Sequence, residues 1–386
     1  MDLHPPFINK KNAKIVSKAI LSGWLSYSGK YVQLFENKIQ KITSAKYSLA
    51  TINGTSAIHL ALLASGLKKN EEVLIPSISF IATINPVIYC NAIPVFMDCD
   101  KNFNLDIKKI IDFLNNETYF KNKSTFNKRT KRKISTIIVV HTFGNPCDIK
   151  NLINIAKKKN ITLIEDAAES LGSYFKYKKK ITHTGTLGMV GCISFNVNKI
   201  ITTGSGGMLI TNSRKIYLKA KHLSTQAKKD PIFFKHDDVG FNYAMPNMNA
   251  ALGLSQLEKL KECLNKKKKI FNLYKSSFDQ IPMIKVLQSN FGLSNHWLII
   301  IKINYKKDLL PKIIKYLRNK KIEVRPVWQL LYKQDKYRKY QKYIVKNSEK
   351  VVKNSLCLPS GVNLNQSEIK KVCKEVKIFL KKEYLI

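Results

Sequence analysis

The chain has 386 residues, 44% of them hydrophobic, so it can bury a large core and exceeds one compact unit in size. Its 67 Lys and Arg residues against 26 Asp and Glu residues give a formal net charge of +41, as in proteins that bind phosphate backbones. The basic residues are spread along the whole chain, and Lys runs such as residues 266–269 lack interleaved aromatic residues, so we expect no specific nucleic-acid partner.

Helical and extended patterns alternate from the amino terminus onward. Helices are predicted over residues 12–22 and 31–42, then a strand ending near residue 51 and an apolar helix over residues 56–65. Strands follow at residues 72–76, 93–97, 134–140 and 161–164, with helices near residues 82–90, 106–114 and 148–159 between them. Repeated βα units predict a mostly parallel sheet covered on both faces. The polar, basic residues 115–133 predict a solvated loop or hairpin.

The carboxyl-terminal third has a second α/β pattern. A long Lys- and Leu-rich helix is expected from about Ser255, with strands near residues 297–303 and 323–327. Further helices are expected after Asp308 and Gln366. We therefore predict a larger domain at residues 1–254 and a smaller domain at residues 255–386.

Apolar runs, cysteines and histidines bear on compartment and metal binding. No run approaches 18 apolar residues, and the amino terminus has no apolar leader core, so we expect neither membrane insertion nor secretion. The seven cysteines form no Cys-x-x-Cys pair and cannot all pair, which fits reduced thiols in a cytoplasmic protein. The scattered histidines indicate no metal site.

Two apolar runs end in ionisable residues that suit one chemistry. Asp166 follows the apolar run that begins at Leu163, and Lys199 lies between the apolar residues 192–195 and 200–201. Ligands of α/β sheets bind at the carboxyl ends of strands, and burial lowers the pKa of a lysine toward a nucleophilic amine. An Asp that holds a ring nitrogen protonated and a Lys that forms an imine are what a pyridoxal phosphate enzyme needs.

Each of these residues also has a simpler interpretation. A single lysine in so basic a chain is usually solvated, and Asp166 alone is as consistent with capping a helix over residues 167–169 as with catalysis. The turn at residues 54–56 directs backbone N–H groups and hydroxyls at an anion, yet an ordinary helix cap has the same sequence. The pairing of acid and amine favours an active site.

Several short motifs carry a resemblance to a known family. They lie at residues 23–24, 28–31, 53–57, 76–83, 165–170, 194–199 and 240–243. Together they resemble the DegT/StrS group of sugar aminotransferases, which are fold type I pyridoxal phosphate enzymes, over nearly the whole chain. The resemblance implies a large domain with a mostly parallel sheet and a smaller carboxyl-terminal α/β domain.

The resemblance also implies roles around the cofactor ring. Lys199 would bind the cofactor covalently and shuttle a proton to the substrate carbon, and Asp166 would pair with the pyridine nitrogen. Phe80 would stack on the ring, Glu169 lies where many relatives have Gln or His near the ring hydroxyl, and Asn196 belongs to the same shell.

The phosphate group would have its own set of residues. By the same resemblance, Gly54, Thr55, Ser56 and Ser194 would hold the phosphate. Asn242 would reach it from the partner subunit of a homodimer with shared active sites.

The substrate follows from a narrower resemblance. Residues 117–132, 141–146, 224–231 and 325–328 look like those of enzymes that aminate C4 of nucleotide-linked 4-keto-6-deoxyhexoses for surface glycans. We predict L-glutamate as amino donor and UDP-2-acetamido-2,6-dideoxy-hexos-4-ulose as acceptor, with GDP-4-keto-6-deoxymannose as the alternative. The candidate substrate residues are Trp24, Tyr27, Arg325 and Trp328.

Two other functions fit the sequence less well than transamination. Dehydratases of the same family commonly replace the lysine with His, so Lys199 argues against that activity. A regulatory protein that binds the cofactor without turnover would not need both Lys199 and Asp166.

Overall fold

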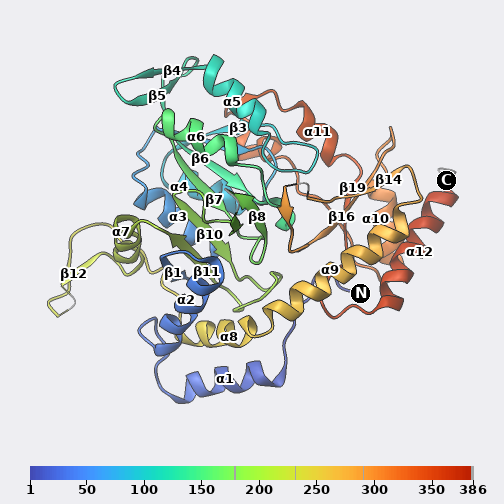
Figure 1. Cartoon of the computed structure of the whole chain (residues 1–386), viewed down its shortest axis with the longest axis horizontal. Helices are drawn as coiled ribbons and strands as arrows, with labels where there is room; N and C mark the ends of the chain where they lie inside the picture. The colour runs from blue at the N-terminus through green and yellow to red at the C-terminus, as the bar shows by residue number, and fades with distance from the viewer. Residues whose placement is uncertain (178–179, 231, 290, 384–386) are drawn as a thin grey trace.

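The computed structural model describes residues 1–177, 180–230, 232–289 and 291–383, and it has an α/β architecture (Figure 1). Within these residues the largest sheet has ten strands, eight of them in the order β1–β11–β10–β7–β6–β2–β3–β18. Only β11 runs antiparallel to its neighbours along this path, so the predicted mostly parallel sheet is confirmed. The bounds are β1 Tyr47–Thr51, β2 Glu72–Pro76, β3 Ile93–Met97, β6 Lys133–Val140, β7 Thr162–Asp166, β10 Val190–Ser194, β11 Gly207–Thr211 and β18 Lys342–Tyr343.

Both faces of this sheet are covered because its strands are apolar on both sides. In β2, Val73 and Ile75 belong to one core and Leu74 to the other, as the alternation of side chains along a strand requires. The first core lies against α2 (Lys30–Thr43), α3 (Gly54–Ala64), α7 (Arg214–Ser224) and α8 (Asn247–Leu257). The second lies against α5 (Ile107–Asn116) and α6 (Lys150–Lys158).

A second sheet lies beside the first, on the right in Figure 1. In the described ranges it has four antiparallel strands in the order β14–β16–β19–β17, namely Ile284–Val286, Ile299–Ile303, Ser355–Leu358 and Arg325–Pro326. Helices α9 (Leu260–Phe278), α10 (Leu310–Asn319) and α12 (Gln366–Lys382) pack on it through the fully buried Tyr274, Ile313 and Val376. A small sheet of β15 (Gly292–Leu293), β8 (Tyr174–Tyr177) and β9 (Lys180–His183) is separate.

Two segments connect regions that are far apart in sequence. Residues 1–6, here called the N-terminal strap, lie along the second sheet: Ser360 N–H donates to the Leu3 carbonyl at 2.8 Å. Strand β18 returns from the carboxyl-terminal region to the edge of β3, just before α11 (Lys346–Val352). Contacts therefore cross the proposed domain boundary after residue 254 in both directions.

Most predicted elements are present, and two differ in form. The helix expected from Ser255 is two helices, α8 and α9, separated at residues 258–259. The helix expected at residues 82–90 is a 3₁₀ turn (Ile81–Thr83) followed by α4 (Asn85–Tyr89), whose first turn contains Pro86. Proline lacks an N–H group and is tolerated only in that first turn, so it separates the two pieces. Residues 118–127 form the predicted hairpin, with β4 (Thr118–Lys121) and β5 (Ser124–Asn127).

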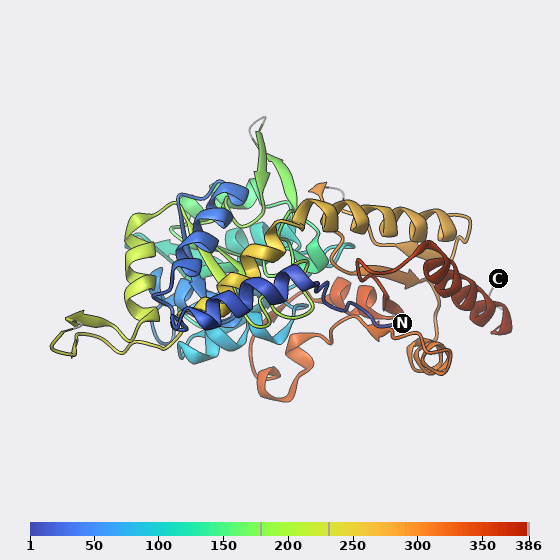
Figure 2. The same cartoon turned by 90° about the horizontal axis from the view of Figure 1, so that it is seen from below.

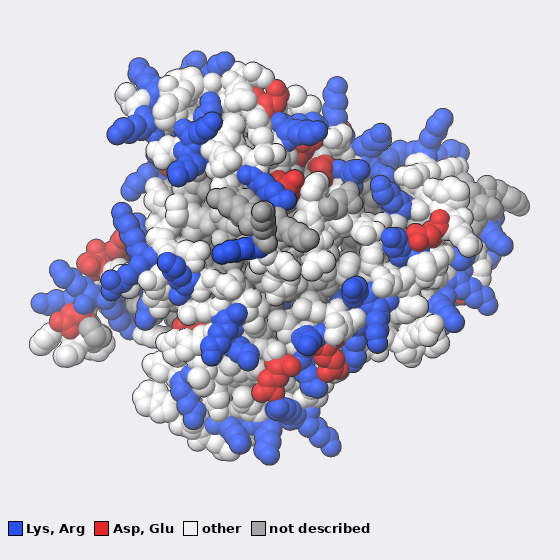
Figure 3. All heavy atoms as spheres, viewed as in Figure 1, with Lys and Arg blue, Asp and Glu red and all other residues white. Residues whose placement is uncertain are grey.

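The face seen in Figure 3 is rich in basic residues, and a hairpin projects from the body in Figure 2. Lys and Arg are distributed over the visible face and few acidic residues lie between them (Figure 3). Strands β12 (Lys228–Asp230) and β13 (Lys235–His236) form a hairpin that projects from the body (Figure 2), with Ile232, Phe233 and Phe234 more than 70% exposed at 77%, 71% and 76%. Helix α1 (Lys10–Leu21) packs outside α8. Among the described helices, none is long and apolar enough to cross a membrane.

Candidate active site

A cavity of about 860 Å³ lies where the carboxyl ends of β7 and β10 face the second sheet and the N-terminal strap. Ligands of open α/β sheets bind at such an edge. Ten of the predicted site residues line this cavity: Gly54, Thr55, Phe80, Asp166, Glu169, Ser194, Asn196, Lys199, Arg325 and Trp328. The structure thus brings together residues that are up to 274 positions apart in sequence, since 328 minus 54 is 274.

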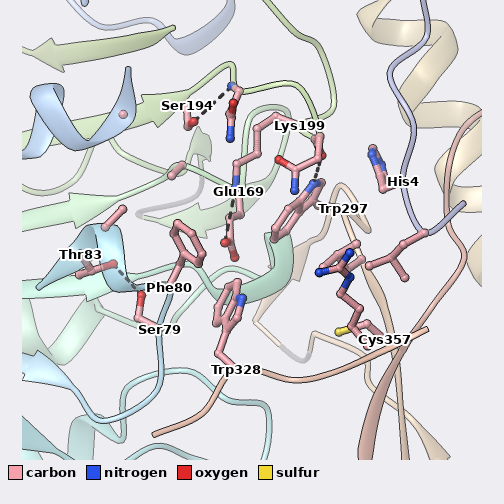
Figure 4. Close-up of a pocket in the computed structure, with 18 of the residues that line it drawn as sticks. His4, Ser79, Phe80, Thr83, Glu169, Ser194, Lys199, Trp297, Trp328 and Cys357 are labelled. Carbon is pink, nitrogen blue, oxygen red and sulfur yellow. Dashed lines mark hydrogen bonds and ion pairs between the residues drawn. The ribbon is translucent and has the colours of Figure 1, made fainter. Parts of the chain in front are cut away.

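Lys199 lies in a turn that follows β10, and its side chain is only 12% exposed. Its Nζ atom is 3.6 Å from Glu169 Oε1 and 3.8 Å from the centre of the Trp297 ring (Figure 4). The Trp297 ring is held in place because its indole N–H donates to the Asn198 carbonyl at 2.6 Å. Burial lowers the pKa of Lys199, and the charges of Glu169 and Asp166 oppose that shift. The amine therefore loses its proton more readily than a surface lysine.

Glu169 is the acidic partner of this lysine. Its Oε2 atom accepts a hydrogen bond from the Phe143 N–H at 2.7 Å, which aims Oε1 at Lys199. Burial raises the pKa of Glu169 to about 7, with the Lys199 charge acting in the opposite direction. The raised pKa of Glu169 and the lowered pKa of Lys199 bring the acidities of the two neighbouring groups closer together.

Asp166 ends β7 and is buried at the floor of the cavity. Its Oδ2 atom accepts from the Thr83 hydroxyl at 2.7 Å, and its Oδ1 atom accepts from the Ala168 N–H at 3.1 Å. Burial raises the pKa of Asp166, while these hydrogen bonds and Lys199 lower it. Residues 167–169 contain no helix, so the interpretation of Asp166 as a helix cap is wrong; the carboxylate is presented to the cavity instead.

The start of α3 forms an anion cradle. Asn53 caps the helix by accepting the Ser56 N–H at 2.8 Å. The N–H groups of Gly54 and Thr55 have no acceptor within the helix, because no helical turn precedes them. A Cβ atom on Gly54 would lie 2.9 Å from Ser194 Cβ, so only glycine allows this helix end to approach β10 so closely. The cradle thus combines N–H groups and hydroxyls, the donors that bind phosphate at helix ends.

Aromatic side chains line the same cavity. Phe80 is 54% exposed, with its ring 6.2 Å from the Trp328 ring. Trp328 in turn stacks on Phe143 at 4.6 Å. An exposed aromatic face inside a cavity is suited to stacking on a planar ring. Amine, buried carboxylate, anion cradle and aromatic face together fit pyridoxal phosphate.

Four predicted residues do not line the cavity in the described part of the chain. Ser56 is buried beneath it, with its N–H bound to Asn53. Trp24 and Tyr27 are 62% and 37% exposed in the loop between α1 and α2. Asn242 forms an isolated bridge with Thr225 near the base of the projecting hairpin.

Three residues of the site are not predicted as site residues from the sequence. Thr83, which holds Asp166, is the last residue of the motif at residues 76–83, so its place in that motif was a usable signal. The sequence predicts that Trp297 begins a strand, whereas β16 begins only at Ile299 and the Trp297 ring lies beside Lys199. His4 lines the cavity from the strap, and no sequence pattern places it there.

The fold and the site define a pyridoxal-phosphate-dependent aminotransferase. A sequence model of the DegT/DnrJ/EryC1/StrS aminotransferase family matches residues 6–377, and the chain belongs to this family of sugar aminotransferases. It is 32% identical over 378 residues to the GDP-perosamine synthase of Escherichia coli O157:H7, covering 98% of each chain.

The names of other similar proteins mention other sugars. The UDP-4-amino-4,6-dideoxy-N-acetyl-beta-L-altrosamine transaminase of Campylobacter jejuni is 31% identical over 78% of this chain and 72% of its own length. The solved structure of Helicobacter pylori PseC, an aminotransferase of pseudoaminic acid biosynthesis, has a TM-score of 0.87 at 24% identity and covers 99% of both chains. That likeness concerns the fold.

Proposed function

We propose that this enzyme transfers the amino group of L-glutamate to C4 of a nucleotide-linked 4-keto-6-deoxyhexose. The observation that carries the proposal is the convergence of Lys199, Asp166 and the cradle at Gly54 on one cavity. When bound, pyridoxal phosphate supplies a carbonyl that takes up the amino group and a ring that withdraws electrons from the reacting carbon.

The residues of the chain have distinct tasks in this proposal. The Lys199 amine would hold the cofactor and would afterwards move a proton at the substrate carbon, for which its burial beside Glu169 suits it. Asp166 would keep the pyridine nitrogen protonated. The N–H groups of Gly54 and Thr55 would hold the phosphate, and Phe80 would offer its ring for stacking.

The acceptor we propose is UDP-2-acetamido-2,6-dideoxy-hexos-4-ulose. The cavity is of the size that buries a large ligand, and Arg325 and Trp328 on its far wall suit a pyrophosphate and a base or sugar face. The name of the Campylobacter relative supports a UDP sugar. The alternative acceptor is GDP-4-keto-6-deoxymannose. The names of the GDP-perosamine synthases of Escherichia coli and Vibrio cholerae, which are 32% and 30% identical to this chain, support a GDP-linked sugar.

A competition experiment decides between the two acceptors. Both keto sugars are offered in one reaction with glutamate, and the amino sugars are identified by mass spectrometry and NMR. A kcat/KM that favours the UDP sugar supports the first proposal. A preference of about tenfold for the GDP sugar, about 1.4 kcal/mol of discrimination in the transition state, supports the alternative.

We further propose that the enzyme is a homodimer in the cytoplasm, with Asn242 reaching the cofactor phosphate of the partner subunit. The support is the projecting hairpin, whose exposed Phe233 and Phe234 form an apolar tip of the kind that marks protein interfaces. The free thiols of all seven cysteines are those of a reducing compartment.

A further inference from the structure

One histidine of the cavity has no role in the function proposed above. His4 lies in the N-terminal strap, is only 9% exposed, and lines the cavity together with Lys199, Trp297 and Arg325 (Figure 4). Neither of its ring nitrogens has a hydrogen-bond partner within the described residues. Burying a polar group without a hydrogen-bond partner costs free energy, so a ligand that supplies the partner recovers part of that cost.

The strap that carries His4 is fixed on both sides of this residue. Before it, Leu3 N–H donates to Glu323 Oε2 at 3.0 Å, and the Leu3 carbonyl accepts the Ser360 N–H at 2.8 Å. After His4, Pro5 packs tightly on Gly361: a Cβ atom on Gly361 would lie 2.7 Å from Pro5 Cδ. The imidazole is therefore held in the cavity wall by the second sheet.

The environment of His4 keeps its ring uncharged. Burial and the nearby Lys267 hold the pKa of His4 well below its ordinary value, and Lys199 acts in the same direction. Lys267 is itself buried and donates to the Trp297 carbonyl at 2.7 Å. A neutral imidazole has one donor and one acceptor nitrogen, so both atoms need a partner of opposite kind.

The two substrates differ in how they match this pair of nitrogens. Hydroxyl and amide groups both donate and accept hydrogen bonds, and the proposed acceptor hexose carries such groups. A carboxylate of glutamate matches only the donor nitrogen, and its ammonium group matches only the acceptor nitrogen. A hydroxyl or acetamido group of the sugar can match either nitrogen, whichever of the two faces the ligand.

We propose that His4 binds the acceptor hexose, with one ring nitrogen hydrogen-bonded to a hydroxyl or acetamido group of the sugar. This inference rests on the proposed function. It assigns to the strap a part in choosing the acceptor and none in the reaction with glutamate.

The test separates the two half-reactions of the intact holoenzyme. His4→Phe keeps a planar ring and removes both nitrogens, and His4→Ala removes them without a ring. The reaction with glutamate is followed by the absorbance of the bound cofactor, and the second half-reaction by formation of the amino sugar. We expect KM for the keto sugar nucleotide to rise about tenfold in both variants, while the glutamate half-reaction changes less than about twofold.

Two further variants distinguish binding from general disturbance of the strap. His4→Gln retains a donor and an acceptor, and we expect it to recover much of the affinity for the sugar. His296→Phe is the matched control, because His296 stacks on Phe271 at 4.1 Å and does not line the cavity in the described structure. We expect this control to leave both half-reactions unchanged.

The assignment is overturned if His4→Phe and His4→Ala leave the sugar KM unchanged, or if the glutamate half-reaction loses as much as the sugar half-reaction. Equal losses in His4→Gln and His4→Ala also overturn it. A wild-type enzyme that reacts with glutamate but aminates none of the keto sugars fails differently: that outcome overturns the proposed function and the sugar assignment with it.

Discussion

At the scale of single residues, Lys199 is distinguished by its surroundings from the many solvated lysines of the chain. Its amine lies between the Glu169 carboxylate and the Trp297 ring, in a cavity whose floor is Asp166. Lys199→Arg keeps the positive charge and lacks a primary amine, so we expect turnover to fall about 10²–10⁴-fold or more. Borohydride reduction of the wild-type holoenzyme followed by peptide mapping should place the cofactor on Lys199. An adduct on another lysine contradicts the assignment.

The Asp166 carboxylate is held by the hydroxyl group of Thr83, which the substitution Thr83→Val removes. The Thr83 hydroxyl donates to Asp166 Oδ2 at 2.7 Å, and a hydrogen bond to a charged group contributes about 1.5–3 kcal/mol. We expect Asp166→Asn to lower kcat by orders of magnitude and Thr83→Val to lower it about tenfold, with the fold retained. Steady-state kinetics and circular dichroism of both variants check this. A Thr83→Val enzyme with lower kcat than Asp166→Asn would contradict the proposed order.

The sequence predicts some residues of this site and not others for a physical reason. Asp166 ends β7 and Lys199 lies shortly after β10, and the carboxyl ends of parallel strands meet at one edge of a sheet, so a local pattern predicts that these two residues lie close together. His4 reaches the cavity only because the strap pairs with Glu323 and Ser360, more than 300 residues away. No local pattern encodes such a contact.

At the scale of elements, Glu36 joins α2 to β1. Its Oε1 atom accepts the Ala50 N–H at 2.7 Å inside the core, and burial raises the pKa of Glu36 from 4.5 to about 7. The folded state thus binds a proton that the unfolded state has released, so stability present below about pH 4.5 is lost as the pH rises through about 7.

Glu36→Gln should remove this part of the pH dependence. The amide oxygen can still accept the Ala50 N–H, and the side chain no longer titrates. Relative to wild type, we expect the variant to gain about 3 kcal/mol of unfolding free energy between pH 4.5 and pH 8. Urea unfolding at a series of pH values measures it. Parallel curves for the two proteins would show that Glu36 is not the group that titrates.

The projecting hairpin is the element on which the proposed dimer depends. Replacing Ile232, Phe233 and Phe234 by Ser removes the apolar tip while leaving β12 and β13 in place. We expect the variant to sediment as a monomer at concentrations where the wild-type protein is a dimer, because interfaces lose most affinity when buried aromatic anchors are removed. A matched replacement of the exposed Leu21 and Leu25 by Ser should leave the association unchanged.

Element boundaries were easier to predict for buried strands than for the long helical segment. Strands β2 and β3 span the predicted residues 72–76 and 93–97, because most of their residues are apolar and pack on both faces of the sheet. Between α8 and α9 the sequence has no Gly or Pro, since residues 258–259 are Glu and Lys, both good helix formers. Helix α8 packs against α1 and α9 packs on the second sheet, contacts that no local pattern encodes.

At the scale of the whole molecule, the charge of +41 comes from Lys and Arg residues along the whole chain, and on the face seen in Figure 3 they do not gather in one patch. We expect the protein to bind heparin or random-sequence DNA at low salt and to release both as salt rises, because such binding depends on counterion release. Fluorescence titrations at several salt concentrations measure the slope. A footprint on one DNA sequence that persists at high salt would show that a specific nucleic-acid site was missed.

The placement of β18 has a consequence for biosynthesis on the ribosome. Residues 342–343 complete the edge of the large sheet beside β3, although β3 itself ends at Met97. A nascent chain therefore exposes an unpaired edge at β3 until residues 342–343 have been made, and such an edge is a template for aggregation. The N-terminal strap is fixed later still, because Leu3 pairs with Ser360. The strands that carry Asp166 and precede Lys199 can pair early, whereas the wall that contains His4 forms only after Ser360 has been made.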